Sequence, residues 1–278
     1  MKLSIRPRWR KVLADLWGNL ARFVLVTLSL TVGLFSVGMI AGGYVTTLQD
    51  MSSGYRAIQP ADLRITTSDF DKNLLERVRR LEGVTAADGE KLFYAQVRSG
   101  EGEWKNMILQ ALPEAGQQVD QIELLTGRMP EAREILLDVH RDVGLATGDL
   151  ATLQLPSGAQ KQLPVSGMVR DQTIGVTGTS YFVAPVHGYV PYESLAWLEQ
   201  PQGYNILLVR VDPGLRAGDV RDLREEITGL VEESGRTVTS LTDLRPASHP
   251  NSGYVRAMSG LLALLGFLSV FLSGFLVF

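Results

Sequence analysis

The hydrophobic and polar positions divide the chain into two uncharged apolar runs and a mixed stretch between them. The first run lies between Arg22 and Asp50, and the second follows Arg256 to the end of the sequence. In a helix, about 20 apolar residues cross the hydrocarbon core of a membrane. We therefore predict transmembrane helices at residues 23–47 and 254–278, on either side of a domain at residues 48–253.

Each apolar run has an alternative interpretation. The first could be a cleaved signal peptide, but it is longer than the roughly 7–15 apolar residues of a signal, and no small-x-small cleavage site follows it. The second could be a buried helix of a globular domain. A helix that is apolar all round and carries no charge instead favours a membrane span.

Residues 1–22 predict a basic amphipathic helix along the inner membrane surface. Apolar residues recur there at helical spacing, and basic residues occupy the opposite face. The residues that define this membrane-interface helix are Trp9, Arg10, Lys11, Leu13, Leu16 and Trp17. The alternative is that these are ordinary flanking charges and an aromatic belt beside the first span.

The distribution of charge predicts the orientation in the membrane. Residues 1–22 carry six basic residues and one acidic residue, whereas the whole chain has a net charge of −3. Positively charged flanks stay in the cytoplasm. The N-terminus is therefore predicted to be cytoplasmic and residues 48–253 extracytoplasmic, in a multi-pass protein of the cell (inner) membrane. The chain has no cysteine, which excludes disulfides and thiolate chemistry.

Two pairs of small residues lie four positions apart within the first apolar run. They are Ser29 with Gly33, and Gly38 with Gly42. Small residues at this spacing let two membrane helices approach closely. We expect these positions to be a packing surface for another helix.

The mixed stretch predicts strand–helix–strand twice, at residues 61–90 and 204–242. We expect the two units to be halves of one α/β part, at about 60–112 and 204–242, with a β-rich insert at about 113–203. In the first unit, Ser68 or Asp69 is the expected N-cap of the helix. A short helix ending at Gly148 is expected inside the insert.

Three common motifs of enzyme active sites are absent from the sequence. There is no phosphate-binding GxxxxGK[ST] loop, no HExxH metal motif and no GxSxG nucleophile elbow. The three histidines, His140, His187 and His249, are far apart. The net charge of −3 gives no basic field for nucleic acid. We expect no catalytic residue, no cofactor and no metal on this chain.

One passage of the insert is unusually specific. It begins with LLTGRMPEAREILLD at residues 124–138 and continues with a Gly-Leu-x-x-Gly-Asp turn and a Leu-x-Val-x-Gly-x-Val-x-Asp strand. Together with the basic preamble, the passage resembles the extracytoplasmic core domain of FtsX-like/MacB-like ABC transporter permeases. The residues that carry the resemblance are Gly127, Arg128, Glu134, Gly148, Asp149, Gly167 and Asp171.

We interpret these residues as scaffold. Glycine permits a tight turn at residue 127. Arg128 is expected to pin that turn through a bidentate salt bridge, to either Glu134 or Asp138. Gly148 and Asp149 are expected to form a turn that sets the register of the next strand.

The resemblance implies an α+β membrane protein, with a ferredoxin-like βαβ/βαβ part that carries a smaller β-rich subdomain. It further implies a permease subunit that couples ATP hydrolysis by a separate ABC ATP-binding subunit to movement of the external domain. Family permeases have at least four spans, so we expect an N-terminal fragment, a truncated product or a two-span variant.

Several partners follow from this implication. They are the ATPase, a second permease copy or a related permease, membrane lipid, and an extracytoplasmic adaptor or substrate protein. The alternative function is a membrane-anchored adaptor that recruits or regulates an external partner, such as a cell-wall hydrolase, without transport.

Overall fold

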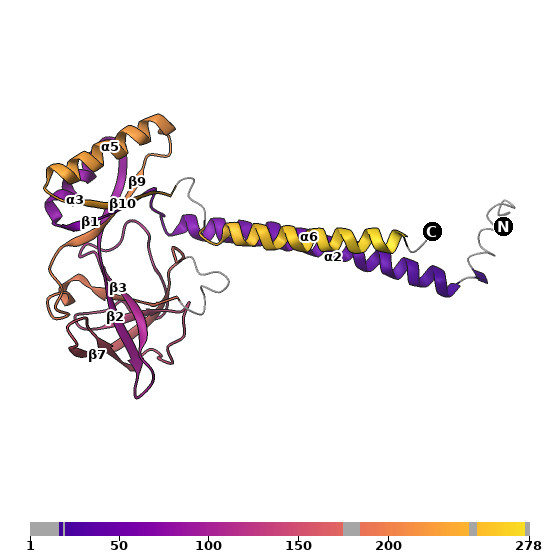
Figure 1. Ribbon diagram of the computed structural model, residues 1–278, viewed down its shortest axis with the longest axis horizontal. Helices are drawn as coiled ribbons and strands as arrows, with labels where there is room; N and C mark the ends of the chain where they lie inside the picture. The colour runs from indigo at the N-terminus through magenta and orange to yellow at the C-terminus, as the bar shows by residue number, and fades with distance from the viewer. Residues whose placement is uncertain (1–16, 19, 175–183, 245–248, 276–278) are drawn as a thin grey trace, which may run out of the picture. The chain divides into compact units, whose positions relative to one another are not determined.

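A computed structural model describes residues 17–18, 20–174, 184–244 and 249–275 (Figure 1). The chain divides into two compact units, residues 1–50 with 252–278, and residues 51–251. The elements, in chain order, are α2 (Leu20–Ala57), β1 (Leu63–Phe70), α3 (Lys72–Arg79), β2 (Val84–Ser99), β3 (Lys105–Leu112), β4 (Glu123–Gly127), β5 (Ile135–Asp138), β6 (Leu150–Gln154), β7 (Gln160–Arg170), β8 (Val186–Pro191), η1 (Tyr192–Ser194), β9 (Tyr204–Val211), α5 (Ala217–Glu233), β10 (Val238–Asp243) and α6 (Ser252–Phe275).

The described residues contain one helix that is long and apolar enough to cross a membrane. That segment is Thr31–Ala57 of α2, while the apolar part Ser252–Leu268 of α6 is shorter. A second span therefore stays a prediction. The 38 residues of α2 give it a length of about 57 Å, well beyond the roughly 30 Å of a hydrocarbon core.

The packing surface predicted on α2 for another helix stays a prediction. Gly33 is buried, but a Cβ atom on Gly38 or Gly42 would meet open space. Within the chain, α6 approaches α2 at Gly266, where a Cβ would lie 3.2 Å from Cγ2 of Val37. The side chain of Ser29 lies outside the described residues.

The predicted membrane-interface helix also falls outside the description, because residues 1–16 are not included in it. Trp9, Arg10, Lys11, Leu13 and Leu16 therefore have no structural account. Trp17 is helical, and 76% of it is exposed.

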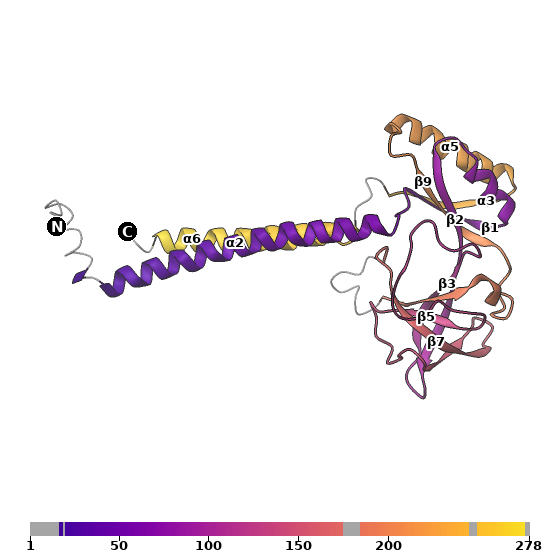
Figure 2. The same cartoon turned by 180° about the vertical axis from the view of Figure 1, so that it is seen from behind.

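The second unit contains a four-stranded antiparallel sheet in the order β10–β1–β9–β2. Each of the two strand–helix–strand units supplies two of these strands. Helices α3 and α5 lie side by side over the sheet in both views (Figures 1 and 2). A core of strand and helix residues fills the space between them, including Ile65, Phe70, Leu75, Leu207 and Ile227.

The other part of this unit is a ring of paired strands. The pairings run β2–β3–β8–β5–β7–β6 and return from β6 to β2, so six strands form a closed barrel. Its interior holds Val97, Leu109, Leu137, Leu153 and Val186, which are all fully buried. Closure pairs the edges that an open sheet leaves exposed, and β4 is added outside the ring, on β7.

The predicted boundary between the α/β part and the β-rich insert is wrong. The insert was expected to begin at residue 113, but β3 and the second half of β2 already belong to the barrel. The first half of β2 pairs with β9 in the four-stranded sheet. One strand of 16 residues is long enough to take part in both sheets, a division that hydrophobic alternation alone does not reveal.

Two local predictions are also corrected. The first helix of the α/β part begins two or three residues later than expected. Its N-cap is Asp71, whose side chain accepts a hydrogen bond from the Leu74 backbone N–H. The expected helix ending at Gly148 is a series of turns and bends. Side chains hold these turns, since Asp149 accepts a hydrogen bond from the Ala146 N–H.

Candidate functional site

The loop that follows β4 is fixed by two glycines that face each other. Gly127 of β4 is the register partner of Gly167 of β7. Gly127 has a φ of +82°, and a Cβ atom there would lie 2.2 Å from the Ser166 carbonyl oxygen. A Cβ on Gly167 would lie 2.4 Å from the Thr126 carbonyl oxygen. The two backbones therefore cross at a distance that only glycine permits.

Directly after this crossing, Arg128 and Glu134 close the loop as a clamp. The Arg128 Nη1 and Nη2 atoms donate to Glu134 Oε2 and Oε1 at 2.7 and 2.6 Å. Glu134 Oε2 also accepts a hydrogen bond of 2.8 Å from the Glu131 backbone N–H. The sequence left Glu134 and Asp138 open as partners for Arg128, and the structure places it on Glu134. The guanidinium lowers the pKa of the Glu134 carboxyl.

We expect Glu134→Gln to increase amide hydrogen exchange over residues 128–134, because an amide cannot accept both guanidinium hydrogen bonds and the Glu131 N–H. Glu131→Gln is the matched control, since that carboxylate lies 3.5 Å from Arg128 and its side chain is 81% exposed. Equal exchange in the wild type and Glu134→Gln would show that the clamp does not hold the loop.

The remaining predicted residues do not gather at this loop. Gly148 has a φ of +97° and open space around it, and its N–H bonds to the Val165 carbonyl. Asp171 is buried, and its carboxylate accepts a hydrogen bond from the Tyr189 hydroxyl. The Asp171 backbone N–H donates in turn to Asp138. These residues fix the turns of the barrel.

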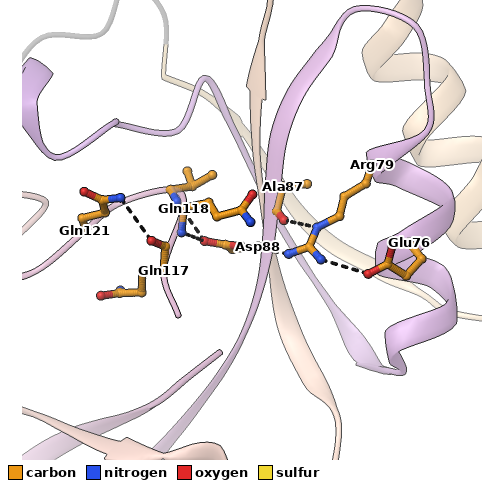
Figure 3. Close-up of polar contacts among 8 residues, drawn as sticks. Glu76, Arg79, Ala87, Asp88, Gln117, Gln118 and Gln121 are labelled. Carbon is orange, nitrogen blue, oxygen red and sulfur yellow. Dashed lines mark hydrogen bonds and ion pairs between the residues drawn. The ribbon is translucent and has the colours of Figure 1, made fainter. Parts of the chain in front are cut away.

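The sequence analysis missed a second polar site, at the point where β2 passes from the four-stranded sheet into the barrel. Asp88 is fully buried there, and its two oxygens bind opposite sides of the unit (Figure 3). Oδ1 accepts from Arg79 Nη2 of α3 at 3.1 Å. Oδ2 accepts from the backbone N–H groups of Gln118 and Val119 at 2.5 and 2.8 Å.

Arg79 extends this network along α3. Its Nε atom donates to the Ala87 carbonyl oxygen at 2.7 Å, and Nη1 donates to Glu76 at 2.9 Å (Figure 3). A planar guanidinium thereby joins the helix to two successive residues of β2. Asp88 is then the shared partner of α3 and of the loop at 113–122, which we call the junction loop.

The other end of the junction loop holds the chain where it leaves α2. The N–H groups of Asp120 and Gln121 donate to the carbonyls of Gln59 and Ile58. The Asp120 carboxylate accepts a hydrogen bond of 2.8 Å from the Ala61 N–H. Gln59 and Asp120 have φ values of +57° and +50°. Such conformations are costly for residues other than glycine and persist where the surroundings enforce them.

Two acids at this junction carry perturbed pKa values. Burial raises the pKa of Asp120 to about 6. Glu90 is buried two residues after Asp88, and its Oε1 has no hydrogen-bond partner among the described residues. Burial raises the pKa of Glu90 to about 8, against the opposing effect of Arg64. At neutral pH the Glu90 carboxyl is therefore protonated, which removes the cost of a buried unpaired charge.

Three solved structures are similar to this chain. One is the extracellular domain of the noncanonic ABC-type transporter YknZ from Gram-positive bacteria, with 14% identity, 65% of this chain and 99% of that chain covered, and a TM-score of 0.46. The second is the periplasmic region of MacB from Actinobacillus actinomycetemcomitans, with 12% identity, 73% of this chain and 94% of that chain covered, and a TM-score of 0.46. The third is a domain of a putative permease protein from Porphyromonas gingivalis, with 15% identity, 66% of this chain and 90% of that chain covered, and a TM-score of 0.41. The sequence matches no family model and no curated protein.

The junction is a network of hydrogen bonds between segments that lie far apart in the sequence. Its donors and acceptors are paired with one another, apart from the protonated Glu90. Among the described residues, no group of three or more His, Asp or Glu side chains is arranged to hold a metal ion. Hydrogen bonds join the residues after α2, the junction loop, β2 and α3, so we regard the junction as the candidate site.

Proposed function

We propose that the chain is a permease subunit of an ABC transporter, or the N-terminal part of one, that transmits movement from membrane helices to an extracytoplasmic domain. The sequence resemblance through Gly127, Arg128 and Glu134 supports the class of protein. The observation that carries the mechanism is the hydrogen-bonded junction at the end of α2. In this proposal the four-stranded part is ferredoxin-like, and the chain spans an inner membrane twice with a cytoplasmic N-terminus.

The proposed mechanism is mechanical. ATP binding and hydrolysis occur in a separate ATPase subunit and displace the span formed by α2. That displacement reaches Ile58 and Gln59, then the junction loop, and then Asp88. Because Asp88 also binds Arg79 of α3, the movement is transmitted to both the four-stranded sheet and the barrel. The output is export, lipoprotein release or signalling, without bond-making chemistry on this chain.

Affinity purification from the native membrane tests the proposed class of protein. The tagged full chain is solubilised in mild detergent, and its partners are identified. We expect a P-loop ATPase in near-equal amount, together with a second permease copy. Recovery of the chain alone, or with an external protein only, would instead support a membrane-anchored adaptor that acts without transport.

Asp88→Asn tests the proposed route. Asparagine offers one carbonyl oxygen in place of two carboxylate oxygens, so it loses either Arg79 or the junction loop. The chain has no cysteine, so spin labels can be placed at introduced cysteines in the β2–β3 hairpin and on α5. We expect nucleotide to change the distance between the labels in the wild-type complex, and to change it much less in Asp88→Asn.

The matched control is Asp212→Asn, because Asp212 is an exposed residue whose carboxylate accepts a hydrogen bond from the Gly214 N–H in its own turn. It should keep the wild-type response. Both variants should recover the same amount of ATPase, since neither residue lies in the membrane helices. A nucleotide response that survives intact in Asp88→Asn would contradict the proposed route.

A further inference from the structure

A groove with a volume of about 420 Å³ lies beside the loop that the Arg128–Glu134 clamp closes. Three segments form it: the start of the junction loop, the residues after Gly127–Arg128, and the end of β8 with η1. Its apolar lining consists of Leu112, Pro113, Met129, Pro130, Pro191 and Tyr192. A volume of this size is within the range of sites that hold a ligand group.

The lining is suited to an apolar side chain. Three of its members are prolines, which have no backbone N–H, so these walls present few donors that would need a polar partner. Leu112 is buried, whereas Met129 is 50% exposed. Methionine has a flexible, polarisable side chain that adapts to different apolar partners. An exposed methionine next to proline residues is therefore typical of a surface that binds another molecule.

The groove is also held rigidly. The Arg128–Glu134 clamp fixes the backbone on both sides of Met129, and Arg128 Nη1 donates to the Met129 carbonyl oxygen as well. On the opposite wall, the ring of Tyr192 packs against that of Tyr204, with 5.1 Å between their centroids. A rigid site loses less conformational entropy when it binds than a mobile one does.

The mouth of the groove is acidic. Glu114 and Glu193 line it, and both are exposed. Glu114 lies 3.9 Å from Lys72, a separation typical of a weak surface pair. Glu193 has no hydrogen bond or ion pair with the part of the chain that the structure describes. Its negative charge is therefore available to a cationic group bound next to it.

We propose that this groove binds an extended segment of an extracytoplasmic protein, in which an apolar anchor side chain stands next to a lysine or arginine. The anchor fills the space between Met129 and Tyr192, and the cation pairs with Glu193. Gly116 and Gln117 of the junction loop also line the groove, so the bound segment contacts the loop that Asp88 holds. The inference deepens the proposed function and rests on it for an external partner.

The test uses the full chain in lipid nanodiscs and a phage-displayed library of random short peptides. We expect enriched peptides to share an aromatic or aliphatic residue beside a lysine or arginine. The most enriched peptide should bind Met129→Ser about tenfold more weakly than the wild type. It should bind Glu193→Gln severalfold more weakly, with a reduced dependence on salt concentration.

Matched controls separate the groove from the general surface. Leu150→Ser alters an apolar residue that is 54% exposed outside the groove, and Glu225→Gln removes a carboxylate on α5. Both should leave peptide affinity unchanged. The proposal is overturned if no such peptide is enriched, or if Leu150→Ser weakens binding as much as Met129→Ser. This result is independent of whether an ATPase is recovered with the chain, so the two proposals fail separately.

Discussion

Gly127→Ala is expected to lower the free energy of unfolding of the unit at residues 51–251 by about 4 kcal/mol. Two costs add together at this position. A residue with a side chain is strained at a φ of +82°, and its Cβ would lie 2.2 Å from the Ser166 carbonyl oxygen. That oxygen belongs to the backbone of β7, which cannot move away without breaking its pairing with β4.

The matched variant is Gly148→Ala, which shares the positive φ but has open space around the new Cβ. It should cost only about 1–2 kcal/mol, from backbone strain alone. Urea unfolding followed by tryptophan fluorescence measures both variants, because Trp104 and Trp197 lie in this unit. Equal losses of stability in the two variants would show that the crossing with Gly167 is not the decisive constraint.

Glu90→Gln is expected to change the pH dependence of stability. Burial holds the pKa of Glu90 near 8 in the folded protein, against about 4.5 when unfolded. Between these values the folded chain keeps a proton that the unfolded chain has lost, so wild-type stability falls as pH rises. Glutamine cannot lose that proton. The variant should match the wild type near pH 5 and exceed it at pH 8 by on the order of 4 kcal/mol.

The surroundings of Glu90 bear on this result. Arg64 of β1 lowers the Glu90 pKa, while Asp120, Asp171 and Asp88 raise it. Asp120, with its own pKa raised to about 6, adds to the wild-type slope and remains in the variant. Unfolding measured from pH 5 to pH 8, with Glu225→Gln as the exposed control, decides the matter. Parallel curves for the wild type and Glu90→Gln would mean that Glu90 is charged in the fold.

The prediction from sequence was most informative where one residue type dictates local geometry. Gly127 and Arg128 predicted a pinned turn, and the structure has one. The reason for the glycine was nevertheless incomplete, because its crossing with Gly167 joins positions 40 residues apart. The N-cap prediction failed because Ser68 and Asp69 have other partners: Thr237, just before β10, and Lys91 of β2.

The junction was not predictable from the pattern of the chain. Asp88 and Glu90 stand in a strand where alternation suggests ordinary polar positions. Their burial depends on the junction loop and on α3, which contribute Gln118, Val119 and Arg79. A buried acid is recognisable only once those partners are placed, since the same residues would be solvent-exposed on an isolated hairpin.

The length of β2 has a consequence for how the external unit is divided. Two domains joined by a linker can be separated by a cut in that linker. Here the first half of β2 pairs with β9 and the second half with β3 and β6. The boundary therefore falls between consecutive residues of one continuous strand. A cut at that boundary would remove a strand from one of the two sheets, so we expect the barrel and the four-stranded sheet to unfold in one cooperative transition.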